Sequence, residues 1–243
     1  MAQQSPPFVR QRISGALLIA GAVIGTVGNA LHPHSASPDP AATVQAIAQN
    51  GAWVAIHLAI IVAILLIIGG LVGLAEELRG SSAEPLARLG LAAALLGGAI
   101  VTVSTALDGF GRKALAVALA DAPAPEAATA LRIAIAANDA QFGLWSIAML
   151  VFFGVTFACF GGAIIASRRF SGWFGWIALV GAGGSAIAAL LQIAANGEVQ
   201  AAETIFLASS IMLTVWTLAV GVRLWRGPSL DVAGEPSLAP TGG

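Results

Sequence analysis

The chain has 243 residues, of which 58% are hydrophobic and only 9% are charged, and its formal net charge is -1. Soluble domains carry about 25% charged residues, so most of the surface of this protein is unsuited to water. The near-zero net charge excludes a strongly basic nucleic-acid-binding protein, and the single cysteine, Cys159, excludes an internal disulfide and a thiolate metal cluster.

Six long apolar stretches organise the chain. The most apolar is AWVAIHLAIIVAILLIIGGLVGLA (52–75), in which His57 is the one ionisable residue. A run of this length predicts a membrane-spanning helix. Five further stretches resemble it, so we predict an all-α integral membrane protein, a six-helix bundle over residues 12–226. The spans are predicted at about 13–31, 52–75, 86–107, 141–166, 173–195 and 204–225.

The first predicted span follows a polar segment, 1–11, that is expected to be cytoplasmic. A basic start before an apolar core is also the pattern of a cleaved signal peptide. Because this core is long and no small-x-small site follows it, we favour a span. Gly21, Gly25 and Gly28 lie on one side of this helix. Small residues at this spacing let a second helix approach closely, either inside the bundle or in a homo-oligomer.

The connection after the first span carries strong helix-breaking and helix-capping signals. The prolines of HPHSASPDP (32–40) are expected to end the span. Asp39 or Thr43 is placed to cap a short helix that ends near Asn50. The sequence therefore predicts a short helix between the first two spans.

The longest connection lies between the third and fourth spans. We expect DGFG (108–111) to end the third span. Residues 112–138 are predicted to form a short helical outer loop at the membrane interface, with a break at DAPAPE (121–126). Its second helix is expected to run on into the fourth span. The Gly-, Pro- and Ser-rich stretch 227–243 is predicted to be a disordered cytoplasmic tail.

The basic residues predict the orientation. Eight arginines fall at one end of the six-span arrangement, whereas only Arg112, Lys113 and Arg132 fall at the other. Basic residues favour the cytoplasmic side, so both termini are predicted to be cytoplasmic. An excess of Ala, Gly and Arg is typical of GC-rich bacterial genomes, so we expect a multi-pass protein of a bacterial inner membrane. The eight arginines at the predicted cytoplasmic end are Arg10, Arg12, Arg79, Arg88, Arg168, Arg169, Arg223 and Arg226.

Polar side chains, including all three histidines, gather near the predicted outer ends of the spans, whereas the cytoplasmic halves are almost purely apolar. Polar side chains are costly in a membrane and usually face the bundle interior or a cavity. We therefore expect an outward-facing polar pocket that binds a small ligand, a metal or a partner. Gln192, Asn196 and Asn29 are the candidate ligand-binding residues.

His57 is the most informative single residue. It lies about 7 Å below the start of its helix, with Trp53 one turn above it on the same face. Together with Asp108 or Asp139, His57 would form a histidine–carboxylate pair suited to proton transfer. These three residues are the catalytic candidates. The competing interpretation is a histidine that is hydrogen-bonded for helix packing, with two carboxylates that simply mark helix ends.

The same region supplies candidate metal ligands, His32, His34 and His57, with the two carboxylates as further donors. Zinc takes three or four nitrogen or oxygen ligands in a tetrahedral array. The HPH motif is weak evidence by itself, because no paired spacing such as HExxH is present. Haem would need His57 and His32 as axial ligands on facing elements. The sequence therefore leaves both zinc and haem open, and the positions of the ligand atoms must distinguish between them.

Three classes of function remain open from the sequence. The first is a membrane protein whose outer pocket binds a ligand or a membrane-protein partner. The second is a membrane-embedded enzyme that acts on a lipid-like substrate with a histidine–carboxylate pair, although no complete catalytic motif is present. The third is a small-solute transporter, which the apolar cytoplasmic halves disfavour. All three classes share the lipid bilayer as surroundings, and none involves nucleic acid.

Overall fold

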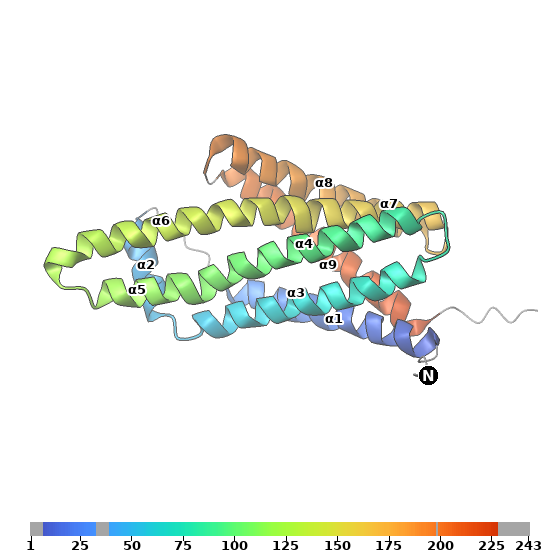
Figure 1. The fold of residues 1–243 in the computed structure, drawn as a ribbon, viewed down its shortest axis with the longest axis horizontal. Coiled ribbons are helices and arrows are strands. Elements are labelled where there is room, and N and C mark those ends of the chain that lie inside the picture. The colour runs from blue at the N-terminus through green and yellow to red at the C-terminus, as the bar shows by residue number, and fades with distance from the viewer. Residues whose placement is uncertain (1–6, 33–38, 198, 228–243) are drawn as a thin grey trace, which may run out of the picture.

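The computed structural model describes residues 7–32, 39–197 and 199–227, and over these ranges the chain is helical without strands (Figure 1). Six helices are long and apolar enough to cross a membrane. The predicted all-α six-helix membrane bundle is therefore confirmed. These six helices are Phe8–Leu31, Trp53–Glu77, Glu84–Ala120, Ala124–Ser167, Gly172–Ala195 and Gln200–Arg226.

The individual elements follow one another with short turns. Two of them, η1 and η2, are π-helical segments, in which the backbone hydrogen bonds reach back five residues and widen the helix. In chain order the elements are α1 (Pro7–Leu31), α2 (Pro40–Gln49), α3 (Trp53–Glu77), α4 (Glu84–Ala106), η1 (Leu107–Arg112), α5 (Lys113–Ala120), α6 (Ala124–Ala148), η2 (Met149–Thr156), α7 (Phe157–Ser167), α8 (Gly172–Ala195) and α9 (Gln200–Arg226).

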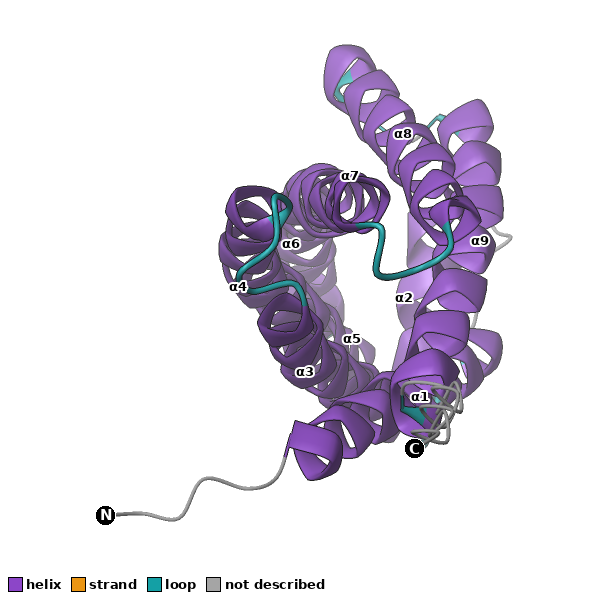
Figure 2. Cartoon of the chain, turned by 90° about the vertical axis from the view of Figure 1, so that its right-hand side faces the viewer, coloured by secondary structure: helices purple, strands orange, loops and turns teal. Residues whose placement is uncertain are grey.

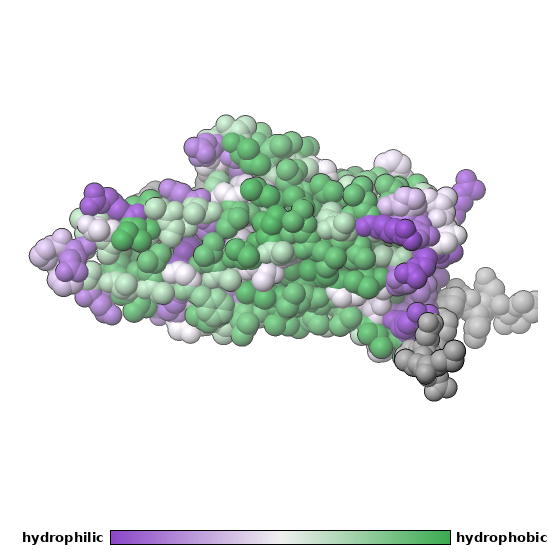
Figure 3. All heavy atoms as spheres, in the orientation of Figure 1, coloured by the Kyte–Doolittle hydropathy of each residue, from purple (hydrophilic) through white to green (hydrophobic). Residues whose placement is uncertain are grey.

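The long helices close a ring, seen end-on in Figure 2. Helix α1 packs against α3 and α9, α3 packs against α4, α4 packs against η2, and α8 joins α7 and η2 to α9. Large side chains fill the interior, among them the fully buried Phe152, Phe160 and Trp216. Outside, an apolar band lies between two polar ends (Figure 3), as expected for helices that meet lipid around their middle.

Glycines on α1 let this helix pack closely against α3. A Cβ added to Gly21 would lie 2.8 Å from the Ala63 carbonyl oxygen of α3, and one added to Gly28 would lie 2.9 Å from Ile60 Cγ1. Both distances are too short for a real carbon contact, so these helices pack through glycine. The glycine stripe predicted on the first span serves a contact inside the bundle.

The arginine-rich segments meet at one end of the bundle, where the N-terminal end of α1, the α3–α4 turn, the α7–α8 turn and the end of α9 lie together (Figure 1). Arg169 donates to the Glu77 backbone carbonyl across two of these segments. The Gln11 side chain of α1 donates to the Glu77 carboxylate at 2.8 Å. Basic residues far apart in the sequence thus share one end, as the six-span topology requires.

The third span does not end at residues 108–111, so that prediction is wrong. The chain continues through η1 into α5 and remains helical to Ala120. Gly109 does not end the helix. Its missing Cβ instead leaves room for the His57 side chain of α3. The connection at residues 112–138 is helical as expected, but α5 and α6 directly prolong the third and fourth long helices beyond the rest of the bundle (Figure 1).

The predicted short helix between the first two spans is confirmed as α2. Asp39 caps it, accepting a hydrogen bond from the Ala41 backbone N–H at 3.0 Å. Several sequence predictions lie outside the described residues: the ends of the chain at 1–6 and 228–243, including most of the expected tail, and residues 33–38, which include His34.

Candidate functional site

Three ionisable side chains from three different parts of the chain meet near the end of the bundle that lies opposite the arginine-rich end. His32 follows the end of α1, His57 is on α3 and Asp108 is on η1. The Nε2 atoms of the two histidines are 3.2 Å apart. Asp108 Oδ2 lies 3.2 Å from His57 Nε2 and 3.6 Å from His32 Nε2. Two of the three residues, His57 at 1% exposure and Asp108 at 8%, are buried. Three potential metal-ligand atoms therefore converge at one buried point.

The proton on His57 is placed by its backbone partner. His57 Nδ1 lies 2.7 Å from the carbonyl oxygen of Trp53, one helical turn earlier. A carbonyl only accepts, so Nδ1 carries the hydrogen and donates it. In the neutral imidazole, Nε2 then presents its lone pair to Asp108 Oδ2, which is itself an acceptor. A cation between these two atoms, whether a proton or a metal ion, is needed to make this contact favourable.

Asp108 is held from two sides. Arg112, one turn further along, donates from Nη1 to Asp108 Oδ1 at 2.7 Å. The Trp53 indole Nε1 donates to the backbone carbonyl oxygen of Asp108 at 2.9 Å. Because Arg112 engages Oδ1, the other carboxylate oxygen, Oδ2, is the one that faces the histidines. Arg112 and Trp53 thus orient the carboxylate and the segment that carries it.

Glycine at position 109 explains why α3 can come so close to η1. A Cβ at Gly109 would collide with the Cβ of His57 and would lie 2.8 Å from His57 Cγ. The π-helical geometry of η1 places Asp108 and Gly109 together on the face that is buried against α3. Such π segments frequently occur at functional sites, because they re-aim side chains within an otherwise regular helix.

Helix α2 packs beside this group of residues. Lys113 donates from Nζ to the carbonyl oxygens of Ile47, Ala48 and Asn50, at 2.8, 2.8 and 2.9 Å, which ties the C-terminal end of α2 to the start of α5. Ile47 packs with Trp53 in a small apolar cluster. The Trp53 ring lies 4.7 Å, centroid to centroid, from the ring of His57. The site is therefore covered by an aromatic ring and a tethered helix.

The three ligand atoms match the spacing of a zinc site. In a tetrahedral site with Zn–N distances of about 2.0–2.1 Å, neighbouring ligand atoms lie about 3.3–3.4 Å apart. The observed separations are 3.2, 3.2 and 3.6 Å. The Nδ1–H donation from His57 to a carbonyl is also the usual outer-shell support of a metal-binding imidazole.

The same spacing disfavours haem. The two axial ligands of a bis-histidine haem stand on opposite faces of the porphyrin. His32 Nε2 and His57 Nε2 are only 3.2 Å apart, with a carboxylate oxygen beside both. This arrangement leaves no space for a macrocycle between the two rings.

The other predicted site residues that the structure describes contribute no ligand atom to this cluster. Asp139 is exposed on α6. Gln192 is buried on α8, where it accepts a hydrogen bond from Ser146 Oγ at 3.2 Å. Asn196 is exposed and adopts the left-handed conformation that ends α8. Asn29 is exposed and donates to the Gly25 carbonyl of its own helix at 2.9 Å.

Arg112 and Trp53 are the residues whose roles sequence reasoning missed. Asp108 and Arg112 are four residues apart, the spacing of an ion pair on a helix. The Asp108–Arg112 ion pair could have been predicted from this spacing if residues 107–112 had been expected to be helical. Trp53 was expected one turn above His57 on the same face but without a bonding role, yet it is 4% exposed and donates to the Asp108 backbone carbonyl.

Two of the surface hollows on the described part of the chain include no residue of the histidine–aspartate cluster. One lies between α5 and α6, around Asp121 and Glu126. The other lies at the opposite, arginine-rich end, between α1 and α9. At the end opposite the arginines, His32 and His57 contact each other, and Ser146 donates to Gln192.

Comparisons with known proteins identify a family but no activity. No curated protein and no solved structure matches the chain. A family model described as a domain of unknown function, DUF4386, matches residues 13–222. That range begins in α1 and ends in α9, so it includes all six long helices. Since the match takes in most of the 243 residues, this protein belongs to the DUF4386 family.

Proposed function

We propose that this integral membrane protein binds one zinc ion, or a chemically similar divalent transition metal, through His32, His57 and Asp108. The observation that carries the proposal is the convergence of two imidazole nitrogens and one carboxylate oxygen, each 3.2–3.6 Å from the other two. Imidazole and carboxylate ligands at this spacing suit zinc. A metal ion also supplies the positive charge that the facing acceptors of His57 and Asp108 require.

The number of protein ligands supports a site with an exchangeable position. Structural zinc sites use four protein ligands, whereas sites that bind a water molecule or a substrate keep three. The cluster offers three ligand atoms among the described residues. This favours a centre at which a further small ligand can coordinate, consistent with a ligand-binding role at the outer end.

A metal-independent acid–base enzyme is the second candidate. The observation in its favour is the 3.2 Å separation of His57 Nε2 and Asp108 Oδ2, which is within reach for proton transfer. Such an enzyme also needs a cavity beside the pair for its substrate. His57 is 1% exposed, and neither surface hollow reaches it. The metal site is therefore the better-supported function.

The test of metal binding is a zinc titration of the detergent-purified protein after treatment with a chelator, read by elemental analysis. We expect one zinc per chain. Asp108→Asn and His57→Ala should weaken binding by more than about 100-fold, because loss of even an outer-shell partner costs about 10–100-fold. Asp139→Asn is the matched control, since it makes the same chemical change on an exposed residue.

Thermal unfolding of each variant shows whether it has folded. Absence of stoichiometric zinc in the folded wild-type protein would overturn the proposal. Equal zinc affinity in Asp108→Asn and Asp139→Asn would also overturn it. A proton between His57 and Asp108 would then be the remaining interpretation of the cluster.

We further propose that the protein resides in the inner membrane of a bacterium, with both termini in the cytoplasm. The gathering of eight arginines at the end where α1 begins and α9 ends supports this orientation. In a Cys159→Ala background, a membrane-impermeant maleimide should label Ala128→Cys in intact cells, but should label Ser82→Cys only after lysis. Both positions are exposed, at opposite ends of the bundle. The reverse labelling pattern would contradict the orientation.

A further inference from the structure

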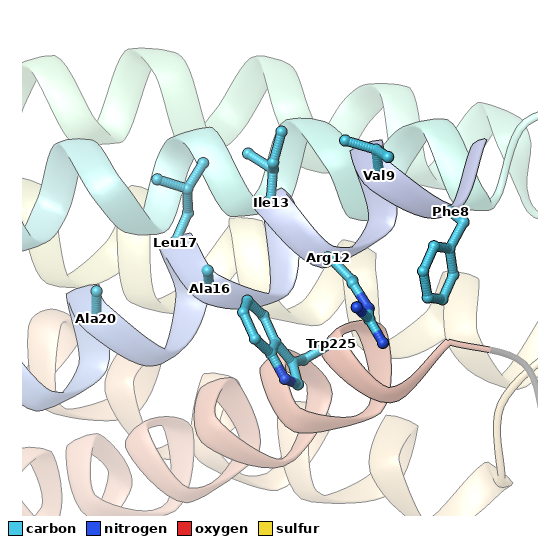
Figure 4. A pocket seen from close by; sticks show the side chains of 8 residues that line it. All are labelled: Phe8, Val9, Arg12, Ile13, Ala16, Leu17, Ala20 and Trp225. Carbon is cyan, nitrogen blue, oxygen red and sulfur yellow. The ribbon is translucent and has the colours of Figure 1, made fainter. Parts of the chain in front are cut away.

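An elongated hollow of about 450 Å³ lies between α1 and α9, at the opposite end of the bundle from the histidine–aspartate cluster (Figure 4). Its size falls within the range of small-molecule sites, about 300–1,000 Å³. Apart from Arg12, its lining is apolar. The lining residues are Phe8, Val9, Arg12, Ile13, Ala16, Leu17, Ala20 and Trp225.

Small residues create this groove. Ala16 and Ala20 lie one turn apart on α1, and their methyl groups leave a depression beside Trp225 of α9 (Figure 4). The residues along its edges are open to the surroundings, with Ile13 54% exposed and Trp225 47% exposed. From Phe8 to Ala20 the groove follows α1 for about 18 Å. That length is close to the depth of one leaflet, since the hydrocarbon core of a bilayer is about 30 Å thick.

Arg12 marks the polar end of the groove. Its guanidinium lies 4.1 Å from the centroid of the Phe8 ring and 5.9 Å from that of Trp225. The Arg12 side chain is exposed, and no ion pair joins it to a carboxylate of the described residues. An arginine stays charged at all physiological pH values and presents a planar fork that matches phosphate. Two aromatic rings therefore hold the Arg12 guanidinium, a group suited to phosphate, at the end of the apolar groove.

We propose that this groove binds an anionic phospholipid, with one acyl chain along α1 and α9 and the phosphate on Arg12. The cluster of basic residues at this end, which also includes Arg10 and Arg226, attracts anionic headgroups to the same level. Trp225 suits this position, because indole rings favour the boundary between the headgroups and the acyl chains. The site is separate from the metal centre, and the proposal does not depend on it.

The test is native mass spectrometry of the full-length protein in detergent, with phosphatidylglycerol or phosphatidylcholine added at equal concentration. We expect preferential retention of phosphatidylglycerol. Arg12→Gln should lower its affinity at least about tenfold, because a hydrogen bond between charged groups contributes about 1.5–3 kcal/mol. Loss of the general attraction of one interfacial arginine costs less, about 1 kcal/mol or about fivefold. Arg10→Gln is the matched control, because it removes the same charge from the same helix but from a residue outside the groove.

A second variant, Ala16→Phe, tests the apolar part. A phenyl ring at this half-buried position should fill the groove and reduce binding of both lipids without a change in charge. Lipid-free thermal unfolding verifies that each variant has folded. Equal retention of the two lipids by the wild-type protein, equal losses in Arg12→Gln and Arg10→Gln, or unchanged binding in a folded Ala16→Phe variant would each overturn the proposal.

Discussion

The close approach of α3 to η1 gives a sharp test of how the candidate centre is built. Gly109→Ala adds one methyl group where the new carbon would lie 2.8 Å from His57 Cγ. Carbon atoms in contact are normally about 3.5–4.0 Å apart, so the two elements must separate by at least about 0.7–1.2 Å, and the collision with His57 Cβ demands more. Ligand distances in a metal site tolerate only about 0.2 Å. A single methyl group should therefore pull His57 away from Asp108.

Gly111→Ala is the matched control. It lies on the same π-helical segment, but its added carbon would meet Leu107 Cδ2 at 3.8 Å, an ordinary contact. Alanine is a better helix former than glycine by up to about 1 kcal/mol, so this variant should be as stable as the wild-type protein or more so. Gly109→Ala should instead lose about 1–3 kcal/mol through overpacking.

The assay is a zinc competition titration against a chelator, run beside thermal unfolding. Gly109→Ala should bind zinc at least about tenfold more weakly, because even outer-shell disturbances cost that much. Gly111→Ala should bind zinc as the wild-type protein does. The reasoning would be refuted if Gly109→Ala bound zinc normally and melted at the wild-type temperature.

Three further predictions concern the surroundings of the site and the bundle. Trp53→Phe removes the indole donor to the Asp108 carbonyl; it should cost about 1 kcal/mol in stability and weaken zinc binding about tenfold, and unchanged zinc affinity would speak against Trp53 as a support. Lys113→Met removes three hydrogen bonds to the end of α2, so amide exchange in α2 should become about 5–30-fold faster while α9 is unaffected; equal exchange in α2 would be contrary evidence. Gly21→Leu should destabilise the bundle by about 1–3 kcal/mol because it forces α1 from α3. Gly183→Leu, where a Cβ meets nothing within 4 Å, should leave the wild-type stability unchanged in thermal unfolding or raise it by up to about 1 kcal/mol; a loss equal to that of Gly21→Leu would contradict the packing argument.

The membrane architecture was predictable because hydropathy depends on each stretch alone. The helix Trp53–Glu77 lies within two residues of the prediction at either end. The end of the third span was not predictable in the same way. Asp and Gly favour turns locally, but at positions 108 and 109 they serve contacts with His57, which is about fifty residues away in sequence. A tertiary contact there overrides the local preference.

The candidate site was partly predictable from the local sequence. Intramembrane ionisable residues are rare, so His57 and Asp108 stand out from composition, and His32 follows as a nearby donor. Asp139 satisfied the same criteria, yet it is exposed on α6. Which side of α6 carries Asp139 depends on the rotation of α6 about its axis, and the sequence of a helix with weak amphipathicity does not fix that rotation. The cover formed by α2 depends on Lys113, a contact no local pattern indicates.

X-ray absorption spectroscopy at the zinc edge is the most direct measurement of the central claim. For the zinc-loaded wild-type protein we predict four light-atom ligands at about 2.0–2.1 Å, with the outer-shell scattering of two imidazole rings. His57→Ala should show one imidazole ring fewer or no bound zinc. A spectrum without imidazole scattering, or one that His57→Ala leaves unchanged, would contradict a zinc centre built from His32, His57 and Asp108.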